Sequence, residues 1–179
     1  VAWGMGTKLD HLAILPSIGL MLGVVSMVGQ NYGAGRIGRV KRTALVGGFY
    51  AAGFALVSAL VYLVFPGFWV SLFNKTGDPV IRELGIGFIH IVAITYIFVA
   101  QAFVLGGVFQ GLGKGMQPLA ITVTRFIVVA IPLALALPPR IGPMGAWWAI
   151  AASHVVGGLM AVVWLLFELR GLGDEKSGD

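Results

Sequence analysis

Five long apolar stretches, separated by short loops that hold nearly all of the charged residues, constrain this chain more than any other feature. About 20 apolar residues in a helix, at about 1.5 Å per residue, span the roughly 30 Å of hydrocarbon in a bilayer. Each stretch reaches that length. We therefore predict transmembrane helices near residues 11–31, 43–65, 85–110, 118–138 and 145–167, followed by a short cytoplasmic tail over 168–179.

The apolar pattern also predicts the fold class. Only helices and closed barrels satisfy every backbone hydrogen bond in lipid, and barrel strands alternate polar and apolar residues over about 10 positions. These stretches are continuously apolar instead. We expect an all-α, polytopic helical bundle that forms a single membrane domain over residues 1–179.

Composition excludes several classes of function. Hydrophobic residues make up 58% of the chain and charged residues 11%, against about 25% charged residues in soluble domains. The net charge of +5 lies in loops, without the basic and aromatic stripe that follows a nucleic acid, so no nucleic acid partner is expected. The chain has no cysteine, and its three histidines stand apart. We expect neither a metal site nor an enzyme.

The distribution of Lys and Arg predicts the topology, because basic loops stay on the cytoplasmic side. One side of the predicted bundle carries Arg36, Arg39, Lys41, Arg42, Lys114, Arg170 and Lys176. The other side carries Lys8, Lys75, Arg82 and Arg140. We expect an integral protein of the cell (inner) membrane whose C-terminus is cytoplasmic.

The longest loop, residues 66–83, is partly apolar and should rest at the outer membrane surface. Asp78 followed by Pro79 has the chemistry of an N-cap and a first helical residue. We predict that a helix begins there.

A few polar side chains fall inside the predicted helices, where they are expected to face the bundle interior or a watery cavity. Gln101, Tyr96 and Arg125 are the residues that we predict to line a central substrate cavity. Gln101 could equally hydrogen-bond to a neighbouring helix, and Arg125 could reach the cytoplasmic headgroups. No Asp or Glu lies within the five predicted helices. A coupling ion, H⁺ or Na⁺, would then bind outside this chain, because carriers hold such ions at embedded carboxylates.

Three sequence elements occur in a recognisable order. Val28 to Gly35 reads V-G-Q-N-Y-G-A-G, Gln110 to Gly113 reads Q-G-L-G, and Arg125 precedes Pro132 by seven positions. Together they resemble motifs of the multidrug and toxic compound extrusion (MATE) transporters. The residues that carry this resemblance, and that we expect to serve structural roles, are Gln30, Asn31, Gly33, Gly35, Gly111 and Pro132.

The resemblance implies a fold of twelve helices in two six-helix lobes, of which this chain matches the last five helices of the second lobe. The N-terminal lobe of the same parent chain would then be a partner, as would the bilayer. The implied function is secondary-active antiport, in which amphipathic or cationic compounds are exported by alternating access and a proton or sodium gradient drives the cycle. No cofactor is implied. In relatives with a cation site in the second lobe, an acidic residue lies in the helix that matches residues 85–110, and Gln101 stands in that neighbourhood here.

Two other functions are compatible with the sequence. A flippase for lipid-linked saccharides shares this helical architecture, and a cavity rich in Arg and Lys would favour it. A membrane scaffold without transport activity would need only apolar helices and close packing through glycine pairs.

Overall fold

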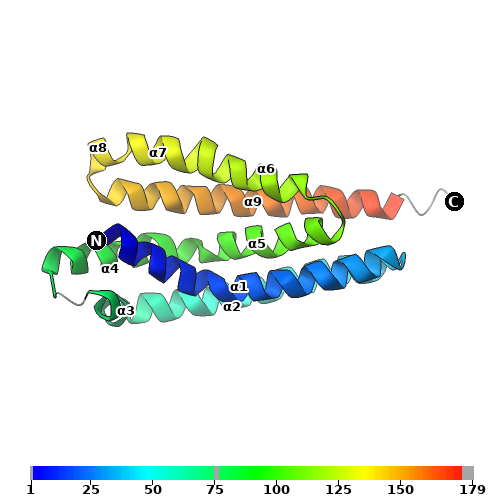
Figure 1. Ribbon diagram of the computed structural model, residues 1–179, viewed down its shortest axis with the longest axis horizontal. Coiled ribbons are helices and arrows are strands. Elements are labelled where there is room, and N and C mark those ends of the chain that lie inside the picture. Colours follow the sequence, from blue (N-terminus) through cyan, green and yellow to red (C-terminus); the bar gives the residue numbers. More distant parts are fainter. Residues whose placement is uncertain (1, 75–76, 175–179) are drawn as a thin grey trace.

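The computed structural model describes residues 2–74 and 77–174 of the chain, and this part is helical apart from short turns. In chain order the elements are α1 (Ala2–Gly33), α2 (Ile37–Val64), α3 (Pro66–Phe73), α4 (Pro79–Val92), η1 (Ala93–Thr95), α5 (Tyr96–Gly111), α6 (Met116–Val123), η2 (Thr124–Ala130), α7 (Ile131–Ala136), α8 (Pro138–Ile141) and α9 (Met144–Asp174). Within these ranges they form five membrane-length apolar helices, which confirms the predicted all-α class. Figure 1 shows the long helices lying side by side along one axis.

Helix α5 lies at the centre of the bundle, where it packs against α1, α2 and α9. Its buried side chains include Val99, Val104, Val108 and Phe109. Figure 1 shows α6, η2 and α7 lying along α9 on one side of α5, while α1 and α2 lie on the other. Helices α1, α2 and α9 therefore take their positions from α5, whereas η2 and α7 pack on α9.

The spans extend beyond the predicted boundaries, and α1 and α9 do so the furthest. Helix α1 begins at Ala2 instead of near residue 11, so Asp10 lies inside the first spanning segment, Gly6–Gly33. The prediction that no acidic residue lies within a transmembrane helix is therefore wrong. Helix α9 continues to Asp174, through most of the predicted tail, and residues 175–179 of that tail lie outside the described residues.

The third and fourth spans are not regular α-helices throughout. The third changes to a 3₁₀ turn at η1, where the Thr95 hydroxyl donates to the Val92 carbonyl at 2.7 Å. The fourth widens to a π-helix at η2, directly before Pro132 in α7. A π segment turns side chains away from their α-helical directions and often marks a functional position. Arg125 lies in this segment.

The predicted helix start at Asp78 is confirmed. The Asp78 carboxylate accepts a hydrogen bond from the Val80 backbone N–H at 2.8 Å, and Pro79 is the first residue of α4. The preceding segment forms α3, whose Trp69 stacks on Tyr62 of α2 with ring centroids 4.7 Å apart. The apolar surface segment is thus anchored to the bundle.

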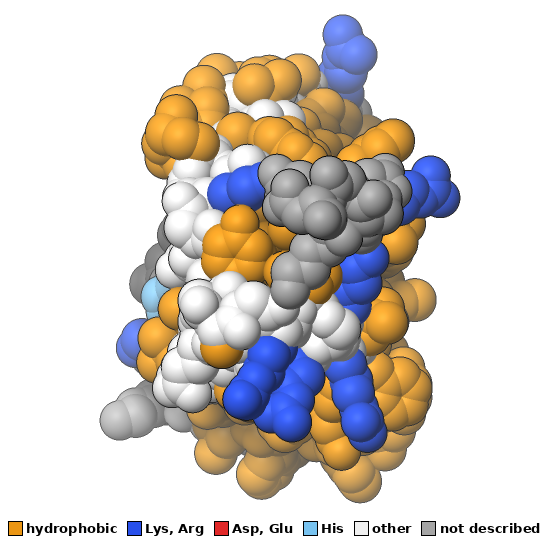
Figure 2. Space-filling view, turned by 90° about the vertical axis from the view of Figure 1, so that its right-hand side faces the viewer, with side chains coloured by type: hydrophobic (Ala, Val, Ile, Leu, Met, Phe, Trp, Pro, Cys, Tyr) orange, Lys and Arg blue, Asp and Glu red, His pale blue; other side chains and the backbone are white. Residues whose placement is uncertain are grey.

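Basic side chains gather at one end of the bundle, where α1 ends, α2 begins and α9 ends. Figure 2 shows Lys and Arg side chains on this end face with no acidic side chain in view. At the same end, Lys114 of the α5–α6 turn forms an ion pair with Glu168 of α9. We call this surface the basic end; its described cations are Arg36, Arg39, Lys41, Arg42, Lys114 and Arg170.

Candidate polar site inside the bundle

A polar cluster lies where α1, α2, α5, η2 and α9 come together. It consists of Asp10, Tyr62, Tyr96, Arg125 and His154, five residues that are far apart in sequence. Asp10 interacts electrostatically with Arg125 and with both tyrosines, and Arg125 also interacts with His154. The fold therefore places one carboxylate and one guanidinium in the same interior region.

Several contacts hold this polar cluster in place. Tyr62 donates a hydrogen bond from its hydroxyl to the Leu9 carbonyl at 3.2 Å, and its ring meets the Tyr96 ring edge-on at 5.9 Å. The Nδ1 atom of His154 lies 2.9 Å from the Thr95 hydroxyl oxygen. Because that hydroxyl donates its one hydrogen to Val92, the histidine nitrogen acts as the donor. These bonds connect α1 to α2 and η1 to α9.

Three polar atoms in the polar cluster are buried and have no hydrogen-bond partner among the described residues. They are Oδ1 of Asp10, the hydroxyl oxygen of Tyr96 and Nε of Arg125. Leaving a buried donor or acceptor unsatisfied costs about 1–3 kcal/mol, and more for a charged group. Binding of a proton, a cation, water or a polar substrate group at such a site would remove this cost and stabilise the protein.

Arg125 reaches this position because α9 offers no side chain opposite it. A Cβ atom added at Gly157 would lie 2.6 Å from Cδ of Arg125. The Arg125 guanidinium carbon lies 4.8 Å from the centroid of the Phe126 ring, and the whole residue is 9% exposed. Glycine on α9 and the π segment together therefore hold the arginine within the bundle.

Arg125 also lines a cavity of about 340 Å³ between α1, α5, α6 and η2. Gln110 and Thr122 contribute further polar groups, and Met21, Phe103 and Phe126 contribute apolar walls. The combination of an apolar wall with a few polar groups is typical of small-molecule sites. Arg125 belongs to both the cavity and the polar cluster.

The three residues predicted to share a cavity occupy two different places. Tyr96 and Arg125 both interact with Asp10. Gln101 instead donates a hydrogen bond from Nε2 to the Gly48 carbonyl at 2.8 Å, which links α5 to α2. The sequence left open whether Gln101 faces a cavity or hydrogen-bonds to a neighbouring helix. This contact is a hydrogen bond to a neighbouring helix.

The residues of the predicted structural motifs end or join helices. The Gln30 amide donates to the Ser26 hydroxyl at 3.2 Å, and the Asn31 amide donates to the Met27 carbonyl at 2.7 Å. Gly35 adopts a positive φ of 68° in the turn before α2, a conformation that glycine enters at low cost. Gly33 ends α1, Gly111 ends α5 against Val25 and Val28, and Pro132 lies in α7.

Sequence reasoning missed Asp10, Tyr62 and the Thr95–His154 pair as members of one site. Asp10 lies just before the charge-free stretch that begins at His11, so apolarity alone does not place it in the helix. Leu9 and Ala13, the buried neighbours of Asp10, carry the signal that could have extended the helix, since they fall four residues apart on one helical face. The other members have no local signal. Among the described residues, no three His, Cys, Asp or Glu side chains group as metal ligands.

Comparison with known proteins shows which family and which relatives this chain is similar to. The profile of the MatE family matches residues 2–136. A "Probable multidrug resistance protein NorM" of Deinococcus radiodurans is 28% identical over 80% of this chain, and the match covers 33% of the relative. The chain therefore spans about a third of the length of that relative.

Solved structures agree with the fold. An inward-facing conformation of a multidrug resistance MATE family transporter of the MOP superfamily matches with a TM-score of 0.86 and 20% identity, over 97% of this chain and 39% of that chain. An outward-facing conformation of such a transporter matches with a TM-score of 0.90 and 20% identity, over 96% of this chain and 38% of that chain.

Proposed function

This chain belongs to the MatE family, and from that premise we propose that it is part of a secondary-active antiporter that exports drugs or organic cations. Its five membrane-length helices and its relatives mark it as an integral membrane protein of a transporter family. The similarity to structures that are more than twice as long supports a parent with a further, N-terminal lobe. The substrate would be a small amphipathic or cationic compound.

Alternating access is the proposed mode of transport. The helices of this chain match both an inward-facing and an outward-facing transporter, with TM-scores of 0.86 and 0.90. A lobe that keeps its internal packing in both states would move as one body against the other lobe. The hydrogen bonds that connect α1 to α2 and η1 to α9 support such a rigid lobe.

Asp10 is the observation that carries the proposal for ion coupling. Asp10 is half-buried in α1; one oxygen of its carboxylate is buried without a hydrogen-bond partner among the described residues, and the group interacts with Arg125 and Tyr96. We propose that this group binds H⁺ or Na⁺ from the gradient, so that a coupling site lies within the chain. A carboxylate that holds a cation no longer attracts a cationic substrate, and this competition couples the two movements.

Within this proposal, Tyr96 acts in the polar cluster, and Arg125 acts in both the polar cluster and the cavity. The Tyr96 hydroxyl, which has no hydrogen-bond partner among the described groups, would share the ion or the substrate with Asp10. Arg125 would attract the Asp10 carboxylate when the ion leaves. It would also contact substrate in the cavity that it lines with Gln110.

We expect Gln101→Ala to lower the stability of the folded protein slightly and to reduce export of every substrate by the same factor. The change removes the hydrogen bond from Gln101 to the Gly48 carbonyl. Such interhelical bonds contribute about 0.6 kcal/mol on average and up to about 1.7 kcal/mol. Thermal unfolding in detergent and export of three chemically different dyes would measure both effects. A loss confined to one dye would instead place Gln101 in the substrate cavity.

The proposed orientation puts the basic end in the cytoplasm, with the C-terminus on the same side. Positive loops are retained on that side of a cell membrane. A tag after the C-terminus that is accessible to a membrane-impermeant reagent in intact cells would contradict this orientation.

A flippase for lipid-linked saccharides is the second candidate, and Arg125 is the observation that favours it. A guanidinium in the cavity would attract the phosphates of such lipids. The Asp10 carboxylate, with which Arg125 interacts in the polar cluster, favours cation export instead.

The test is export by the protein that contains this chain, expressed in cells without their own drug exporters. We expect an energised cell to export a fluorescent cation such as ethidium. This export should stop when a protonophore or removal of Na⁺ dissipates the driving gradient. Export that survives both treatments would overturn the antiport proposal. Movement of an anionic lipid-linked saccharide without export of cations would support the flippase.

A further inference from the structure

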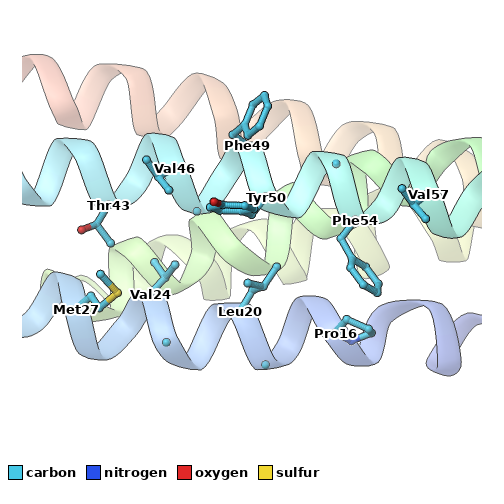
Figure 3. A pocket seen from close by; sticks show the side chains of 14 residues that line it. Pro16, Leu20, Val24, Met27, Thr43, Val46, Phe49, Tyr50, Phe54 and Val57 are labelled. Atoms are coloured by element: carbon cyan, nitrogen blue, oxygen red, sulfur yellow. The ribbon is translucent and has the colours of Figure 1, made fainter.

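A long apolar groove runs along the surface between α1 and α2, outside the polar site. It encloses about 870 Å³, which falls within the usual range of about 300–1,000 Å³ for ligand pockets. We call it the α1–α2 groove; it is lined by Pro16, Gly19, Leu20, Gly23, Val24 and Met27 of α1 and by Thr43, Val46, Gly47, Phe49, Tyr50, Gly53, Phe54 and Val57 of α2. In Figure 3, Met27 and Thr43 lie at one end of it and Pro16 and Val57 at the other.

The length of the α1–α2 groove matches one leaflet of a bilayer. The lining residues run from Pro16 to Met27 on α1 and from Thr43 to Val57 on α2, which correspond to about 17 Å and about 21 Å at about 1.5 Å per residue. One leaflet contributes about half of the roughly 30 Å of hydrocarbon. The wall is almost wholly apolar, as a hydrocarbon chain requires and a cationic substrate does not.

Glycine makes the α1–α2 groove deep. Cβ atoms added at Gly19, Gly23 and Gly53 would meet no other atom within 4 Å, so these positions border open space. Aromatic side chains on α2, among them Tyr50 and Phe54, also line the groove and are exposed. A flexible chain could therefore lie against the helix backbones between aromatic rings.

The basic end supplies charge at one end of the α1–α2 groove. Arg39 lies four residues before Thr43, and Arg42 lies four residues before Val46, so both arginines continue the groove-lining face of α2 by one turn. Both are exposed. On α1, the amide side chains of Gln30 and Asn31 follow Met27 by three and four residues on the same face. Cationic and amide donors therefore surround the end of an apolar channel.

We propose that the α1–α2 groove binds an anionic phospholipid from the leaflet at the basic end. The phosphate would lie on Arg39 and Arg42, and an acyl chain would fill the groove toward Pro16. Basic side chains near a membrane surface attract anionic headgroups, and an acyl chain has the length and the apolarity of the groove. This inference rests on the membrane-spanning fold and does not depend on the transported substrate.

The experiment measures lipid binding to the full-length protein by native mass spectrometry, with phosphatidylglycerol and phosphatidylcholine as probes. We expect wild-type protein to retain phosphatidylglycerol preferentially. R39Q/R42Q should bind it roughly ten- to thirty-fold more weakly, because two headgroup contacts are lost. Gly23→Leu should displace the acyl chain while both arginines stay in place. Equal binding of the two lipids by wild-type protein, as expected if another part of the parent covers the groove, would overturn the proposal.

Two control variants separate this site from general effects. Arg170→Gln removes a cation from the same basic end but on α9, and Gly171→Leu enlarges a glycine that also borders open space. Both should retain phosphatidylglycerol as wild-type protein does. The proposal fails if Arg170→Gln loses as much lipid as R39Q/R42Q, or if Gly23→Leu keeps its lipid. Lipid retention by a protein that exports nothing would leave this site standing and count against the proposed function alone.

Discussion

Replacing Asp10 with Asn should abolish gradient-driven export, with at least a ten-fold loss of rate, while the protein still inserts and folds. Asn has nearly the same shape and is neutral, so it removes the charge without leaving a buried ion. It cannot release a proton or hold Na⁺ by charge, and it cannot attract Arg125 or a cationic substrate. Uptake of substrate into proteoliposomes that carry an imposed ion gradient would measure the loss directly.

Asp78→Asn is the matched control for this prediction. Asp78 caps α4 at the membrane surface through the Val80 N–H, and Asn caps a helix about as well as Asp. This variant makes the same chemical change away from the polar cluster, and export should stay normal. Normal export by Asp10→Asn at normal expression would show that the coupling ion binds elsewhere in the parent protein.

The five spans could be predicted from sequence because each depends on local apolarity over about 20 residues. The helix start at Asp78 could be predicted for the same reason, since a capping side chain and a proline act within one turn. The beginning of α1 could not be found from charge-free stretches, because Asp10 lies inside the helix and interacts there with Arg125 of η2. Local sequence contains no description of that interaction.

The candidate site depends on contacts between residues that are far apart in the chain. Thr95 and His154 are 59 positions apart, and Tyr62 and Leu9 are 53 apart. Apolar periodicity indicates which segments are helices but not which faces meet. Gln101 illustrates the difference, because a polar residue in the middle of a span predicts an interior position equally well whether it meets a cavity or the Gly48 carbonyl.

Gly158→Ala should destabilise the protein by about 1–3 kcal/mol or more. A Cβ atom at this position would stand 2.6 Å from Cα of Phe98, far inside van der Waals contact. The neighbour is backbone, so no rotation of a side chain can relieve the clash, and α9 must move away from α5. Thermal unfolding of the purified protein should show a midpoint several degrees below that of the wild type.

The same substitution should also impair the polar site, because the two contacts lie one turn apart. Gly158 follows His154 by four residues, and Phe98 follows Thr95 by three, so widening the α5–α9 contact stretches the Thr95–His154 hydrogen bond. Gly171→Ala, on the same helix where a Cβ meets open space, should unfold at or slightly above the wild-type temperature because alanine favours helix. An unchanged midpoint for Gly158→Ala would show that α5 and α9 can separate without cost, and the rigid lobe required for alternating access would then lose its support.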